Sequence, residues 1–151
     1  MDIRVATEKD LDTIEALFED LDALHRDRLP NRFRAPTEPA RSREHLNGLF
    51  IEPSAILIAD DTGFIHVTLR EPPPLPIFVP RRFVRIENII VAARARRRGI
   101  GRALFAAAES WAKDRGATEL ELTVYTANHE ALAFYRALGF TDLAARLARA
   151  V

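Results

Sequence analysis

Cysteine is absent from this chain of 151 residues, so disulfide bridges, thiolate nucleophiles and cysteine-ligated metals are excluded. Long apolar runs are also missing. The longest uncharged ones, such as Ile89–Ala93, are a handful of residues, whereas a membrane-spanning helix needs about 20. The first residues show no signal-peptide core. We therefore expect a cytoplasmic protein that makes no contact with a membrane.

The chain also has no net charge, because 22 Lys and Arg balance 22 Asp and Glu. A general nucleic-acid binder usually carries a positive excess, so we expect no nucleic-acid partner. The charges are unevenly distributed, since residues 1–80 contain 9 basic and 15 acidic residues and residues 81–151 contain 13 and 7. This division suits a protein that binds one cationic and one anionic ligand. The plain alternative is the ordinary variation of surface charge along a chain.

The hydrophobic pattern predicts one α/β domain over residues 1–151, with a mixed sheet and helices on both faces. A chain of this length can bury a sizeable core. The secondary structure of the tail after residue 140 is left undecided, because its alanines favour a helix and its alternating leucines allow an edge strand. The expected strands are 2–6, 55–60, 64–71, 83–91 and 118–125, and the expected helices are 8–25, a second one capped by Thr37 or Ser42, 99–115 and 128–138.

A glycine loop joins the predicted strand 83–91 to the predicted helix 99–115. Helix N-termini have unsatisfied amide donors and partial positive charge, and glycines let a phosphate approach those amides. Five arginines between Arg94 and Arg102 add positive potential. We interpret the loop as a pyrophosphate cradle, with a solvated basic loop as the alternative. No Gly-Lys-Ser/Thr follows, and the third glycine of a dinucleotide fingerprint is missing.

Two segments resemble signatures of the GNAT-type N-acetyltransferases. Arg96-Arg97-Arg98-Gly99-Ile100-Gly101 is similar to the family's Arg/Gln-x-x-Gly-x-Gly/Ala motif, and Asn128–Phe140 is similar to its Asn-x-x-Ala-x-x-Phe-Tyr-x-x-x-Gly-Phe segment. The resemblance covers residues 55–142, and one departure is Ala93, where the family often has proline. It implies a mixed, mostly antiparallel sheet of about six or seven strands with splayed central strands, flanked by about four helices.

The resemblance implies acetyl-CoA as the co-substrate. Main-chain groups of Ile89 and Val91 are expected to pair with the pantetheine arm, and the Ile90 amide is the expected oxyanion donor. Amides from Arg97 to Arg102 are expected to bind the pyrophosphate. Asn128 is expected to contact pantetheine or to cap its helix, a position that asparagine favours. The predicted cofactor-binding residues are Ile89, Ile90, Val91, Arg96, Arg97, Arg98, Gly99, Ile100, Gly101, Arg102, Asn128 and Tyr135.

The reaction implied by the resemblance is direct attack of a neutral amine on the thioester. Tyr135 takes the position of the family's general acid, and a phenol with a pKa of about 10 can protonate a departing thiolate. Glu87 is the only acid in strand 83–91 and is expected to act as the base, through water. Strand alternation places Glu87 on the face of Ile89. The alternatives are a core tyrosine and a structural or substrate-orienting carboxylate.

The acceptor is expected to be a primary amine of a small molecule or peptide. The walls of the acceptor-binding pocket are expected to come from residues 18–36, the proline-rich loop 71–83 and the strand around Tyr125. The alternatives are a protein N-terminal or lysine acetyltransferase and a non-catalytic acyl-CoA-binding regulatory module. No metal site is predicted, and the family resemblance makes a homodimer an expectation. The candidate acceptor residues are Asp20, His25, Phe33, Glu71, Phe78 and Tyr125.

Overall fold

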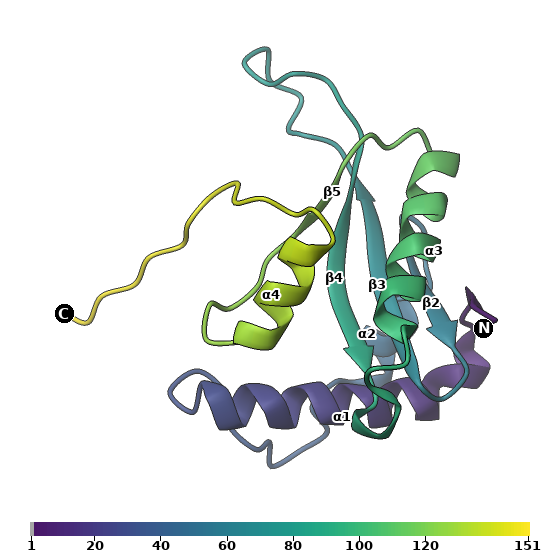
Figure 1. The fold of residues 1–151 in the computed structure, drawn as a ribbon, viewed down its shortest axis with the longest axis vertical. Helices are drawn as coiled ribbons and strands as arrows, with labels where there is room; N and C mark the ends of the chain where they lie inside the picture. The colour runs from purple at the N-terminus through teal and green to yellow at the C-terminus, as the bar shows by residue number, and fades with distance from the viewer. Residues whose placement is uncertain (1) are drawn as a thin grey trace.

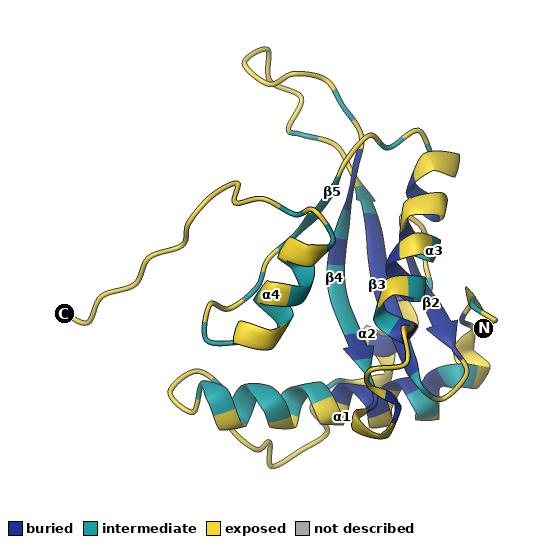
Figure 2. Cartoon of the chain, in the orientation of Figure 1, coloured by how far each residue is buried: buried dark blue, intermediate teal, exposed yellow. Residues whose placement is uncertain are grey.

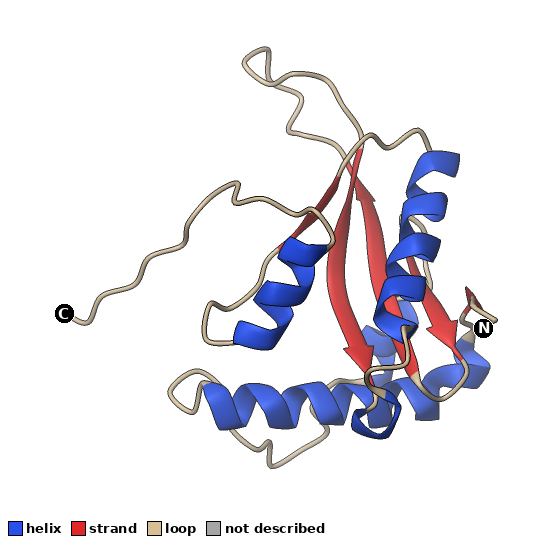
Figure 3. Cartoon of the chain, viewed as in Figure 1, coloured by secondary structure: helices blue, strands red, loops and turns tan. Residues whose placement is uncertain are grey.

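The computed structural model describes residues 2–151 and contains a five-stranded sheet in the order β1-β2-β3-β4-β5 (Figures 1 and 3). Neighbouring strands from β1 to β4 are antiparallel, whereas β5 runs parallel to β4. The predicted mixed sheet is therefore confirmed. The strands are β1 (Arg4–Val5), β2 (Ser54–Ala59), β3 (Gly63–Arg70), β4 (Phe83–Val91) and β5 (Leu120–Leu122).

Four α-helices accompany the sheet: α1 (Leu11–Arg28), α2 (Arg43–Gly48), α3 (Ile100–Asp114) and α4 (His129–Ala137). Ser42, rather than Thr37, caps α2, because its Oγ accepts a hydrogen bond from the His45 amide at 3.1 Å. Asn128 caps α4 in the same way. Within residues 2–151, no helix is both long and apolar enough to cross a membrane.

The helices cover both faces of the sheet. The ring of Phe64 meets Phe18 of α1 at 5.1 Å between centroids, whereas the position of a Cβ on the preceding Gly63 faces Leu104 of α3. Consecutive residues of a strand point to opposite faces, so α1 and α3 lie on opposite sides of β3. Strands β2 and β3 are almost entirely buried between them (Figure 2). In contrast, β5 and α4 contain no fully buried residue.

The C-terminal part of the prediction needs correction. The strand expected over residues 118–125 is shortened to β5, because its later residues diverge from β4. The sheet has five strands instead of the expected six or seven. Residues 141–151 form neither the helix nor the strand that the tail allowed, and all of them are exposed. A strand needs a neighbour for its backbone groups, and the tail pairs with no strand of the described chain.

Gly63 begins β3 where the backbone of β4 passes closely. A Cβ at this position would lie 2.6 Å from the Ile90 carbonyl oxygen. We expect Gly63→Ala to lower the free energy of unfolding by about 1–3 kcal/mol, as measured by urea denaturation, because the added methyl group must displace backbone. Gly48→Ala is the matched control, since no atom lies within 4 Å of its Cβ position and stability should not fall. Equal stability of the two variants would contradict the close contact.

Candidate active site

Strands β4 and β5 diverge after three paired positions. Ile86 pairs with Leu122, the last residue of β5, whereas β4 continues to Val91 without a neighbour on that side. The main-chain groups of β4 beyond Glu87 therefore border an open slot. This is the predicted splay of the central strands.

The ladder between β3 and β4 decides which main-chain groups face the slot. The Ala92 amide donates to the Thr62 carbonyl at 2.8 Å. Hydrogen-bonded pairs alternate along an antiparallel ladder, so Ile90, opposite Phe64, also turns its main-chain groups toward β3. Ile89 and Val91 turn theirs toward the slot. This direction agrees with the expectation that main-chain groups of Ile89 and Val91 pair with a pantetheine arm. It disagrees with the expectation that the Ile90 amide is the oxyanion donor, because the Ile89 amide faces the slot instead.

Glu87 lies at a β-bulge. His66 pairs with Asn88 and Val67 pairs with Ile86, so Glu87 is an extra residue with no partner across the ladder. A bulge interrupts the alternation of side chains and re-aims them. Glu87 Oε1 accepts a hydrogen bond at 2.9 Å from Arg70, which lies on the α1 face of β3. The bulge therefore turns Glu87 toward α1 and away from the Ile89 face that simple alternation predicted.

His66 lies on the same face of β3 as Arg70. It is 6% exposed, and neither Nδ1 nor Nε2 has a hydrogen-bond partner among residues 2–151. Burial lowers the pKa of His66 to about 4, and the nearby Glu87 charge opposes that shift. The site therefore contains a buried neutral imidazole that the sequence analysis missed. The available signal was a histidine between the apolar residues Ile65 and Val67 of a predicted strand. Residues 2–151 contain no cluster of three or more possible metal-ligating side chains.

The loop before α3 has an unusual backbone. Gly99, the N-cap of α3, has φ +79°, and Arg97 has φ +64°, a conformation that a non-glycine residue rarely adopts. A Cβ on Gly99 would meet nothing within 4 Å, so its open side is accessible to a ligand. Gly101 differs, because its Cβ would lie 3.0 Å from Phe134 Cζ. Its missing side chain makes room for α4 rather than for a phosphate.

The arginines of this loop fall into two groups. Arg94 pairs with Asp61 at 2.9 Å, and Arg96 Nε donates to the Val91 carbonyl at 3.3 Å. Arg97, Arg98 and Arg102 are exposed and have no ion pair within the described chain. Three uncompensated cations beside a helix N-terminus favour an anionic ligand. This arrangement supports the predicted pyrophosphate cradle.

Helix α4 positions the two remaining predicted residues. Tyr135 packs among aromatic rings, with centroids 5.9 Å from Phe105 and 6.1 Å from Phe140. Burial raises the pKa of Tyr135 to about 12, so its hydroxyl stays protonated at neutral pH. That hydroxyl makes no hydrogen bond to residues 2–151. Asn128 Oδ1 accepts a hydrogen bond from the Ala131 amide at 3.3 Å, which leaves the side-chain nitrogen available as a donor.

Three predicted acceptor residues meet at the end of α1. His25 stacks on Phe33 at 4.9 Å between centroids, and Tyr125 lies edge-on to both at 5.8 and 5.6 Å. Burial is the main cause that lowers the pKa of His25. Arg28 holds this end of α1 against α4, because it donates to both oxygens of Glu130 at 2.9 and 3.0 Å. We call His25, Phe33 and Tyr125 the aromatic wall.

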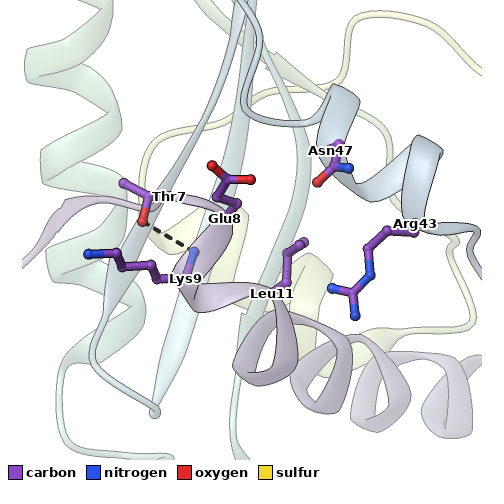
Figure 4. Close-up of a pocket in the computed structure, with 6 residues that line it drawn as sticks. All are labelled: Thr7, Glu8, Lys9, Leu11, Arg43 and Asn47. Carbon is purple, nitrogen blue, oxygen red and sulfur yellow. Dashed lines mark hydrogen bonds between the residues drawn. The ribbon is translucent and has the colours of Figure 1, made fainter.

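Other predicted acceptor residues lie elsewhere. Loop 71–82 projects from the end of the sheet opposite α1 (Figure 1), so Glu71 and Phe78 do not join the aromatic wall. Two surface hollows also lie outside the slot. One is lined by Glu71–Pro76 and Phe78–Arg82, and the other lies between the start of α1 and α2 (Figure 4). Neither hollow includes a predicted catalytic or cofactor-binding residue. The residues that line the second hollow are Thr7, Glu8, Lys9, Leu11, Arg43 and Asn47.

An unpaired strand edge beside an arginine-rich helix N-terminus fits an acyltransferase. The profile of the Acetyltransferase (GNAT) family matches residues 15–140, and the chain belongs to this family. Aminoglycoside N(6')-acetyltransferase type 1 of Klebsiella aerogenes is 34% identical over 106 residues, which cover 67% of this chain and 68% of that protein.

Solved structures share the fold over the full length. A tetramutant of the BH1408 protein of Bacillus halodurans superposes with a TM-score of 0.93 at 27% identity, covering 100% of both chains. The aminoglycoside N-acetyltransferase AAC(6')-Iy, solved in complex with CoA, superposes with a TM-score of 0.69 at 21% identity, covering 99% of this chain and 98% of that chain.

His66 should make the stability of the fold depend on pH. Its pKa is about 4 in the folded protein, whereas an ordinary histidine has a pKa of 6.5. Between those values the unfolded chain binds the extra proton, so stability falls as the pH is lowered from 6.5 toward 4. His66→Gln should remove up to about 1.4 kcal/mol per pH unit from this slope, as measured by urea unfolding.

His129→Gln is the matched control, because His129 is exposed. The slope should be unchanged in that variant. An unchanged slope in His66→Gln would show that the imidazole is not held neutral by burial.

Proposed function

We propose that this protein transfers an acetyl group from acetyl-CoA to a primary amine of a small molecule. The observation that carries the proposal is the unpaired edge of β4 at Ile89 and Val91, beside the uncompensated arginines at the start of α3. The edge suits the two amides of a pantetheine arm, because it offers alternating donors and acceptors as a strand does. The accessible side of Gly99 suits a close approach of phosphate oxygens.

Acetyl-CoA, when bound, supplies the activated thioester that the amine attacks. Main-chain groups of Ile89 and Val91 would hold the pantetheine arm in the slot, and the Ile89 amide would supply a hydrogen-bond donor for the thioester oxygen. Loop amides from Arg97 to Arg102 bind the pyrophosphate, with the side chains of Arg97, Arg98 and Arg102 as counter-charges. The side-chain nitrogen of Asn128 donates to the pantetheine while its Oδ1 caps α4.

Glu87 and Tyr135 divide the proton transfers between them. Arg70 holds Oε1 of Glu87, and Oε2 has no partner among residues 2–151, so Oε2 accepts the proton that the amine loses, directly or through water. The Tyr135 hydroxyl donates the proton that the departing sulfur needs. Its pKa of about 12 keeps the hydroxyl protonated throughout the neutral range, and no protein acceptor within the described chain competes for its proton.

The acceptor side suits a cationic amine. The aromatic wall offers aromatic rings that attract a cation, and Tyr125 is 46% exposed. Burial lowers the pKa of His25, which favours the neutral form of this member of the wall. The curated relative is named as an aminoglycoside acetyltransferase, and aminoglycosides carry several primary amines. We therefore propose amino sugars as the first substrate class to test.

Acetyl-CoA and free CoA should raise the melting temperature of the pure protein. A ligand at about 100 times its Kd adds about 2.7 kcal/mol, which is readily measured. Arg97→Gly keeps the main-chain amide, removes the side chain and relieves the positive φ, so it should melt no lower than the parent without ligand. Its ligand-induced shift should be smaller at equal CoA concentration.

Arg94→Gln serves as the control, because the Arg94 side chain already forms an ion pair with Asp61. Its ligand-induced shift should match that of the parent. No shift of the parent at millimolar acetyl-CoA would overturn the proposed cofactor site.

Glu87→Gln should lower kcat by about 10²-fold or more and abolish the fall in rate on the acid side of the pH profile. A thiol-detecting dye measures the released CoA without background, because the chain has no cysteine. Arg70→Gln is the matched control, since it breaks the same ion pair but keeps the carboxylate and should retain the acid limb. Tyr135→Phe should lower kcat and also retain that limb. An acid limb that persists in Glu87→Gln removes Glu87 from the role of base.

A further inference from the structure

One arginine joins the end of α1 to the segment between β5 and α4. Arg28 Nη1 donates hydrogen bonds to the Ala127 carbonyl at 3.3 Å and to Glu130 Oε2 at 3.0 Å, and its Nη2 donates to Glu130 Oε1 at 2.9 Å. In Figure 1 the start of α4 lies above the end of α1, as these contacts require. We call Arg28, Ala127 and Glu130 the clasp.

The clasp is better built than an ordinary surface ion pair. Exposed pairs contribute little, because water screens them and two long side chains must be ordered. Here a planar guanidinium makes two hydrogen bonds to one carboxylate, a geometry that lysine cannot reproduce. The third hydrogen bond, to a main-chain carbonyl, fixes the backbone as well. The hydrogen bond from Arg28 also lowers the pKa of Glu130 to about 2, so the ion pair persists at neutral pH.

The clasped segment carries one residue of each proposed ligand site. Tyr125, at its start, belongs to the aromatic wall, and Asn128 caps α4 and is proposed to donate to pantetheine. The Asn128 amide donates to the Tyr125 carbonyl at 2.9 Å, so the two residues are the ends of one tight turn. Ala127, which Arg28 holds, lies inside that turn. A movement of the turn therefore displaces both ligand sites.

Arg28 is the polar link between α1 and this segment. Within residues 2–151, its hydrogen bonds are the only ones that join α1 to residues 120–140. Helix α4 is otherwise held from its other end, where Tyr135 packs on Phe105 of α3 at 5.9 Å between centroids. Loss of the clasp should therefore free the turn and the start of α4 while the aromatic packing keeps the rest of the helix in place.

The aromatic wall touches the clasp from the side of α1. His25 lies three residues before Arg28, which is the same face of the helix, and its ring meets that of Tyr125 at 5.8 Å. We propose that Arg28 is a positioning residue that couples the two ligand sites, because the turn it fixes lets acetyl-CoA bound at Asn128 order the aromatic wall for the acceptor amine. Arg28 touches neither ligand, and its role rests on the proposed function.

The coupling follows a short path of observed contacts. A pantetheine that accepts a hydrogen bond from Asn128 orients that side chain, whose Oδ1 already caps α4. The turn then keeps Tyr125 in register with Asn128, and the clasp keeps the turn against α1. The ring of Tyr125 in turn sets the surroundings of His25. Coupling between two ligands is mutual, so an acceptor on the wall should also raise the affinity for CoA.

Nuclear magnetic resonance of the His25 ring tests the proposal without an identified acceptor. Burial lowers the pKa of His25, so at neutral pH its signal reports ring contacts rather than protonation. The chain has only four histidines, and the signal is assigned by its loss in His25→Gln. Saturating free CoA should shift this signal in the parent. In Arg28→Gln the shift should be lost, although calorimetry on the same sample shows that CoA is bound.

Arg26→Gln is the matched control. Arg26 lies on the same end of α1 and pairs with Glu19 of the same helix at 2.7 Å, and it makes no hydrogen bond to residues 120–140 of the described chain. This variant loses the same charge and should keep the shift of the His25 signal. Circular dichroism should show that both variants are folded, since the ring contacts of α4 with Phe105 are untouched.

The partner carboxylate gives a second test of the same contact. The Glu130 side chain is 73% exposed, so Glu130→Gln should fold, and it should weaken the response of His25 to CoA. Combining it with Arg28→Gln should add nothing further, because both changes remove one contact. Arg28→Lys keeps the charge without the planar fork and should also lose the response. Full rescue by lysine would contradict a positioning role.

The outcomes separate the clasp from the cofactor site. A shift of the His25 signal that persists at saturating CoA in Arg28→Gln overturns the coupling, and so does a parent that binds CoA without a shift. An equal loss in Arg26→Gln also overturns it, because charge at the end of α1 would then explain the response. These three results leave acetyl transfer standing. A parent that binds no CoA overturns both the coupling and the proposed cofactor site.

Discussion

The parting of β4 from β5 is the constraint on which the rest of the structure depends. The main-chain groups of a strand inside a sheet normally form hydrogen bonds to both neighbouring strands. A buried backbone group without a hydrogen-bond partner costs free energy. Here β5 ends its pairing at Leu122, so Ile89 and Val91 turn main-chain groups toward the slot with no strand beside them. Of these groups, the Val91 carbonyl accepts a hydrogen bond from Arg96 Nε. The same strand then runs into the loop that starts α3. A ligand that enters the slot as a surrogate strand therefore reaches the positive end of a helix at once.

The bulge at Glu87 follows from the same strand. The extra residue lets β4 carry a carboxylate on the α1 face while the residues on either side of the bulge still pair with β3. Arg70 holds one oxygen of that carboxylate, and the neutral His66 lies on the same face. Such a bulge separates the two tasks of β4. In the proposed reaction, its slot-facing main chain binds the cofactor and its re-aimed side chain acts on the acceptor amine.

Local signals predicted much of the fold and the loop. The strand predicted over 83–91 has the observed bounds of β4. Gly116 and Gly139, which directly follow the predicted helices 99–115 and 128–138, have the positive φ that glycine provides. The errors arose where the answer depends on pairing. The face of Glu87 and the direction of the Ile90 amide follow from the ladder with β3, whose register no local pattern reveals. Sequence spacing likewise could not show that Gly101 accommodates Phe134, a contact between two helices.

The structure of the tail 141–151 also could not be predicted from a local pattern. Its alternation reads as a strand, but a strand exists only where another strand offers its edge. Strand β5 and helix α4 contain no fully buried residue, although Tyr135 of the candidate site lies in α4 and Asn128 caps it. The edge of β4 is open because β4 and β5 pair at only three positions, and the same short pairing leaves β5 with few contacts.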